Sequence, residues 1–216
     1  MVPSFYMDIK EEITLKLKRK NQILISKDSS ILLELNALLA VSSPKTIIYW
    51  ALRESERIGK RLDEHFHDPL FTELSDAAWR WAKGERKMFE VKPLILTVHS
   101  YARETDDVVM QALRHAMGQG CSTVHTKKHA PGLVMYEMTA LVKENGIEDL
   151  SYLYATKEYY IERLMDAHNC VRSVKMPLLS PEKRNGSSGL TACRSALAER
   201  SSHFSAGGSG FSYCVH

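Results

Sequence analysis

The most regular pattern of apolar positions in the chain begins just after Ser43. Ser43 suits a helix N-cap, and Pro44 suits the first helical turn, where its missing N–H costs nothing. Small or apolar residues then recur every three or four positions along one helical face: Ile48, Ala51, Leu52, Ser55, Ile58 and Leu62. This spacing predicts an amphipathic helix that ends at the HDP sequence of residues 67–69.

Similar stripes follow along the chain up to residue 170. They predict helices over residues 70–81, 88–102 and 108–125, a helix with Pro131 in its first turn and a stop at Gly146, and a last, aromatic-rich helix over 148–169. Thr105 and two aspartates suit the start of the third of these, and Gly146 suits the end of the fourth. Six helices with short connections favour antiparallel neighbours, so the expected fold is an all-α, compact multi-helix bundle.

One residue interrupts this regular pattern. Pro93 lies inside the helix expected over residues 88–102, where proline removes a backbone hydrogen bond and crowds the preceding turn. We therefore expect a kink or a break near Val91.

The two ends of the chain differ from the middle. Residues 8–40 favour two short helices, the second starting after Asp28, Ser29 and Ser30, although ITLKLK alternates as a strand would. The last 46 residues contain 10 Ser and 5 Gly without a long apolar stripe, which is typical of disorder. The predicted organisation is an N-terminal helical extension (1–42), a helical domain (43–170) and a Ser/Gly-rich tail (171–216).

Composition and charge narrow the class of protein. The chain is 44% hydrophobic and 25% charged, as globular proteins are, and it has no run of about 18 apolar residues that could span a membrane. Its net charge of +3 comes from the tail, which carries about +4, and this argues against nucleic acid as a partner. Four widely spaced cysteines and the absence of an apolar leader predict a cytoplasmic protein. The mixed charges on the helix from Ser43 predict a solvated face.

Histidines form the one cluster with possible chemistry: His99, His115, His125 and His129. His125 and His129 are four positions apart, and His99 and His115 lie on inward stripes of neighbouring helices, so shared metal binding is conceivable. HExxH and repeated ExxH patterns are missing, which favours histidines that are satisfied within the fold. Cys121, one turn before His125, could imitate a thiol–imidazole pair but lacks a third, orienting group.

Three sequence features together resemble a known family. A Trp-led helix from Trp50 closes on a DPL turn, an AxxWAKGE segment runs from Ala78 to Glu85, and a GQ…STVHxxxHAxG stretch contains His125 and His129. In this order they resemble the small helical bacterial family of putative immunity proteins (immunity-five-like), over about residues 45–170. The resemblance implies a protein that binds and neutralises a cognate toxin without catalysis and without a cofactor.

Two other functions remain open at this point. One is a metal-dependent helical-bundle enzyme that uses the four histidines. The other is a helical scaffold with no dedicated partner. The sequence does not identify which surface would bind a partner.

Overall fold

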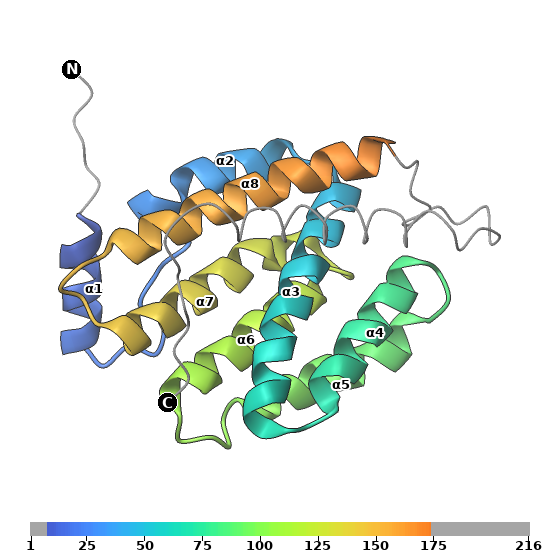
Figure 1. Ribbon diagram of the computed structural model, residues 1–216, viewed down its shortest axis with the longest axis horizontal. Coiled ribbons are helices and arrows are strands. Elements are labelled where there is room, and N and C mark those ends of the chain that lie inside the picture. Colours follow the sequence, from blue (N-terminus) through green and yellow to red (C-terminus); the bar gives the residue numbers. More distant parts are fainter. Residues whose placement is uncertain (1–7, 174–216) are drawn as a thin grey trace, which may run out of the picture.

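The computed structural model describes residues 8–173, and these form an all-α structure (Figure 1). Two short 3₁₀ turns, Ser30–Leu32 and Lys127–His129, accompany eight α-helices in the described part of the chain. The helices are α1 (Ile9–Lys18), α2 (Leu33–Val41), α3 (Pro44–Phe66), α4 (Leu70–Ala82), α5 (Met88–Tyr101), α6 (Val108–Ser122), α7 (Ala130–Asn145) and α8 (Ser151–Ser173). The prediction of an all-α fold is confirmed.

The helix α3 organises the bundle, because it contacts α4, α6, α7 and α8 (Figure 1). α4 and α5 pack together at one end, whereas α2 and α8 lie side by side at the other. The start of α3 follows the sequence closely: the Ser43 side chain accepts a hydrogen bond from Thr46 N, and Pro44 is the first helical residue. Asp107 caps α6 in the same way, by accepting from the backbone N–H groups of Val109 and Met110.

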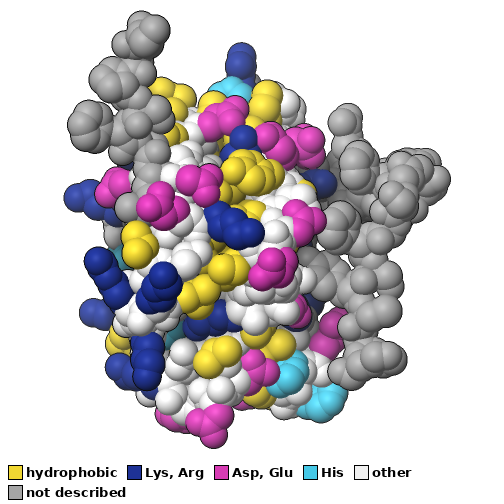
Figure 2. Space-filling view, turned by 90° about the vertical axis from the view of Figure 1, so that its left-hand side faces the viewer, with side chains coloured by type: hydrophobic (Ala, Val, Ile, Leu, Met, Phe, Trp, Pro, Cys, Tyr) yellow, Lys and Arg dark blue, Asp and Glu magenta, His cyan; other side chains and the backbone are white. Residues whose placement is uncertain are grey.

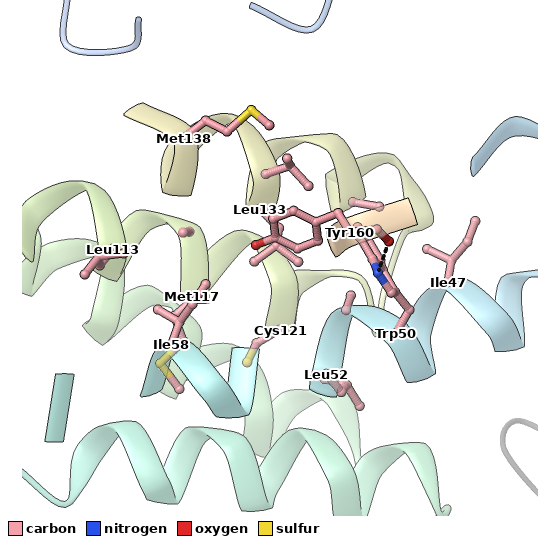
Figure 3. Packing of buried hydrophobic residues seen from close by; sticks show 14 of the residues in the cluster. Ile47, Trp50, Leu52, Ile58, Leu113, Met117, Cys121, Leu133, Met138 and Tyr160 are labelled. Carbon is pink, nitrogen blue, oxygen red and sulfur yellow. Dashed lines mark hydrogen bonds between the residues drawn. The ribbon is translucent and has the colours of Figure 1, made fainter. Parts of the chain in front are cut away.

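The core lies where α3, α6, α7 and α8 meet (Figure 3). The predicted stripe of α3 is buried throughout its length, and Trp50 and Tyr160 are among the largest fully buried side chains. The Trp50 indole Nε1 donates to the Tyr160 backbone carbonyl at 3.2 Å, shown dashed in Figure 3. This bond satisfies the one polar atom of Trp50 and ties α3 to α8.

The segment before Ser43 contributes to the same core. Ile9, Ile13, Leu24 and Ile25 are almost completely buried, and Leu24 N donates to the Thr139 hydroxyl of α7. ITLKLK is helical, so the strand alternative is wrong. The buried residues of this helix, α1, are Ile9 and Ile13, which are four positions apart and therefore lie on one helical face.

Three expected boundaries need correction. α5 is continuous through Pro93, so of the expected kink or break the break is not found. Pro93 is exposed, as is Phe89, whose carbonyl loses its N–H partner. α6 ends at Ser122 rather than His125, because the backbone N–H groups of Val124 and His125 donate to carbonyls three positions earlier, in a tighter turn than the α-helix.

The last correction concerns α8, which begins at Ser151, after Asp149 accepts a hydrogen bond from Ser151 N, and extends to Ser173. Residues 171–173 of the predicted tail therefore belong to this helix. The rest of that prediction lies outside the described residues. Between residues 8 and 173, no helix combines the length and apolar character needed to cross a membrane.

Candidate functional site

The four histidines singled out in the sequence lie on α5, α6 and the turn that leads into α7, and they form two pairs. His99 Nδ1 lies 3.1 Å from His115 Nδ1, which joins α5 to α6. His125 Nε2 lies 3.2 Å from His129 Nε2, within the turn between α6 and α7. His99 and His115, which lie on neighbouring helices, are therefore in contact, although both are only partly buried.

A glutamine that the sequence argument passed over orients the second pair. Gln119 Oε1, from the last turn of α6, lies 2.8 Å from His129 Nδ1. A carbonyl oxygen can only accept a hydrogen bond, so Nδ1 of His129 carries the ring proton. The GQ element that precedes the two histidines in the sequence could have indicated this contact.

Two glycines provide the room that the histidines need. A Cβ atom on Gly118 would lie 2.6 Å from Cε1 of His99, and one on Gly132 would lie 2.8 Å from Oε1 of Gln119. Both distances are too short for non-bonded atoms, so the imidazole and the amide occupy the space of the missing side chains. The glycines therefore serve close helix packing.

The environment of the cluster favours neutral imidazoles. Burial, followed by the nearby charge of His99, lowers the pKa of His115 to about 4. Burial also lowers the pKa of His99, and the charge of His129 lowers it further. Burial and then the charge of His125 lower the pKa of His129. The His115 ring lies against Tyr136, with 4.9 Å between ring centroids. Deprotonated imidazoles are the form that accepts hydrogen bonds or binds metals.

The histidines do not form a site with three protein ligands. Over residues 8–173, no group of three or more His, Cys, Asp or Glu side chains is arranged to hold a metal ion. Cys121 does not form the thiol–imidazole pair considered from the sequence: it is fully buried, its thiol is hydrogen-bonded to Ser55, and burial raises its pKa to about 12. Its thiol is therefore kept from reaction.

A second candidate site is a groove between α3 and α8 with a volume of about 190 Å³. Arginine and aromatic side chains dominate its lining, which is formed by Tyr49, Trp50, Arg53, Glu54, Arg57, Tyr159, Arg163, Asp166 and Ala167. The Tyr159 ring lies between two guanidinium groups, 5.2 Å from that of Arg57 and 5.3 Å from that of Arg163. We call this surface the α3–α8 groove.

An ionic network underlies the α3–α8 groove. Arg57 donates through Nε to Glu54 at 2.9 Å and through both terminal nitrogens to Glu137 of α7. The hydroxyl of Tyr159 donates to Glu54 at 3.0 Å, and that of Tyr160 donates to Glu137. Burial alone would raise the pKa of Glu137, but the charge and hydrogen bonds of Arg57 hold it below its usual value.

The expectation of a solvated charged face on α3 is wrong for Glu54, whereas Arg57, Lys60 and Glu64 are exposed. Glu54 is only 2% exposed, and the Arg57 side chain retains 40% of its exposure. The sequence did not indicate the burial of Glu54, because the network that surrounds it includes residues distant in sequence, on α7 and α8. Other charged groups do lie at the surface: on the face shown in Figure 2, side chains of both signs are interspersed among apolar ones.

Comparison with known proteins gives one result. Residues 37–165 match the family described as Imm-5 like putative immunity protein, which is more than half of the chain. No curated protein and no solved structure matches. The matched residues span α3 to α7 and most of α8, and they include both histidine pairs and all of the α3–α8 groove except Asp166 and Ala167. The chain therefore belongs to the Imm-5 like putative immunity protein family.

Proposed function

We propose that this protein neutralises a cognate bacterial toxin by binding it in the cytoplasm, without catalysing a reaction. Membership of an immunity protein family over residues 37–165 is the observation that carries the proposal. A protein of this kind needs a rigid, complementary surface rather than reactive groups. Cys121, the one nucleophilic side chain considered from the sequence, is buried and protonated, which agrees with a binding role.

The α3–α8 groove is the surface that we assign to toxin binding. Tyrosine and arginine are enriched among the residues that dominate binding energy in protein interfaces. Here the ion pairs and hydroxyl bonds beneath the groove hold Arg57 and Tyr159 in place before any partner binds. Side chains that are already ordered lose less conformational entropy on binding, so the network favours affinity.

Co-expression provides the functional test. The toxin encoded beside this gene is expressed from an inducible promoter, with and without the protein, and growth is followed. We expect rescue of growth and a stable complex in size-exclusion chromatography. If no neighbouring toxin is neutralised or bound, the proposed function is wrong.

Surface variants test the binding site separately from the function. The double substitution Arg53→Ala/Arg163→Ala removes two guanidinium groups from the groove and leaves the Arg57 network intact, so the fold should persist. We expect the toxin to bind at least about tenfold more weakly, a loss of about 1.4 kcal/mol. Phe89→Ala is the control, since Phe89 is 71% exposed on α5, outside the groove. Loss of binding in the control alone would place the interface on α5.

A further inference from the structure

We propose that His125 and His129 form a two-nitrogen chelating site for a divalent transition-metal ion of the zinc class. The Nε2 atoms of the two rings lie 3.2 Å apart at the turn between α6 and α7. This site is independent of toxin binding and implies no catalysis.

The protonation of His129 supports the proposal. Its Nδ1 donates to Gln119 Oε1 at 2.8 Å, so the ring proton is on Nδ1 and the lone pair is on Nε2. Without a metal, Nε2 of His125 donates to this lone pair at 3.2 Å. A bound ion would take the place of that proton, and the ring proton of His125 would then be on Nδ1. Histidines that bind metals almost always donate their other ring N–H to a carbonyl, carboxylate or water, which fixes the tautomer as Gln119 does here.

The separation of the two nitrogens suits one shared ion. Zinc–imidazole bonds are about 2.0–2.1 Å long, so an ion bonded to two nitrogens 3.2 Å apart would make an N–metal–N angle of about 103°. This is close to the tetrahedral angle that zinc prefers. His125 is exposed, so water can reach the remaining coordination positions.

The surroundings predict which ions bind and how tightly. Imidazole nitrogens suit zinc, copper and nickel, whereas magnesium and calcium prefer oxygen ligands. Two protein ligands, next to the positive charges of Lys127 and Lys128, predict weaker binding than a site with three or four ligands would give. His99 and His115 have a similar nitrogen separation, but both are partly buried and His115 is stacked on Tyr136, which makes them less accessible.

Calorimetric titration with zinc chloride tests the site in the full-length protein purified without a histidine tag. We expect one zinc ion per chain and no heat with magnesium. His125→Ala should weaken zinc binding at least about tenfold without unfolding the protein, because this side chain is exposed. Gln119→Ala should weaken it about tenfold through loss of the orienting bond, whereas Gln119→Glu, which keeps an acceptor oxygen, should retain most of the affinity.

His168→Ala is the matched control, since His168 is an exposed histidine at the far end of α8. Unchanged zinc affinity in this variant, together with the loss in His125→Ala, would support the site. Equal zinc binding by His125→Ala and His168→Ala, or no zinc binding by the unmodified protein, would overturn the proposal.

Discussion

Arg57 and Glu137 form a two-point ion pair that joins α3 to α7 across 80 positions of the chain, with nitrogen–oxygen distances of 2.7 and 2.8 Å. Glu137 is only 6% exposed, so Arg57 and the hydroxyl of Tyr160, rather than water, stabilise its negative charge. Glu137→Ala leaves Arg57 with Glu54 as its one carboxylate partner and removes the acceptor of the Tyr160 hydroxyl. Removing one partner of a buried pair costs about 3–5 kcal/mol, and we expect the lower end here because Arg57 is partly exposed.

The same pair of helices offers a matched control. Glu144 lies two turns further along α7 and pairs with Arg61 of α3 at 2.7 Å, but both side chains are about one-third exposed. Exposed pairs contribute about 0–1 kcal/mol, so Glu144→Ala should have little effect on stability. Urea denaturation of both variants measures the difference. Equal losses would show that burial does not distinguish the two pairs.

Gly120 is predicted to tolerate no side chain. A Cβ atom there would lie 2.0 Å from Ser55 Oγ and 3.2 Å from the Ala51 carbonyl, where α3 and α6 are in contact. Gly120→Ala should therefore destabilise the fold by about 1–3 kcal/mol through overpacking, although alanine favours helices.

Gly59→Ala tests whether the cost at Gly120 comes from packing. A Cβ on Gly59 would lie 3.0 Å from the terminal methyl of Met117, and this flexible side chain can move aside. Thermal melts should show a stability within about 1 kcal/mol of the unmodified protein, because the helix preference of alanine offsets the contact. If Gly120→Ala is equally harmless, the close approach of α3 and α6 is not as described.

His115 makes the free energy of unfolding depend on pH. Burial lowers its pKa from 6.5 to about 4, and the charges of His99, Arg103 and Lys143 act in the same direction. Between these values the unfolded chain binds a proton that the folded chain excludes, so the free energy of unfolding falls as the pH drops from about 6.5 to about 4. Above pH 6.5 the contribution of His115 is fully present.

A non-titrating substitution isolates this effect. In His115→Gln, the free energy of unfolding should fall less between pH 7 and pH 4.5 than in the unmodified protein. Glu137 contributes little to this difference. Its pKa is about 4.5 in the unfolded chain and lower in the folded protein, so the stability that its charge contributes is lost mainly below pH 4.5. Parallel pH profiles of urea midpoints for the two proteins would contradict the role assigned to His115.

Cys121 should report unfolding through its reactivity. Its thiol is fully buried, and burial raises its pKa to about 12, so almost no thiolate is present near neutral pH. Peptide mapping after treatment with iodoacetamide should show Cys121 unmodified in the folded protein and modified in urea. Rapid modification without urea would mean that the contact between α3 and α6 opens readily.

Local periodicity was enough to predict the helices but not every boundary. The cap at Ser43 and the buried stripe of α3 follow from neighbouring residues. The end of α6 depended on a change to backbone hydrogen bonds that span three residues, and the continuous helix α5 carries Pro93 at an exposed position. Such effects depend on which backbone groups water can reach, which spacing alone does not show.

The candidate sites were predictable to different degrees. The histidine pairs could be anticipated because their members lie on neighbouring helices or four positions apart. The α3–α8 groove could not, since Arg57 meets Glu137 and Tyr160 only when α3, α7 and α8 assemble. The charges of α3 looked like an ordinary solvated surface for this reason.

Binding between the purified protein and the toxin encoded beside it, measured by calorimetry, tests the proposed function most directly. An inactive variant of the toxin avoids damage to the host during expression. We predict a 1:1 complex that protects growing cells from the active toxin and that is weakened at least about tenfold by Arg53→Ala/Arg163→Ala. Protection of cells without any measurable complex, or no protection from any neighbouring toxin, would contradict it.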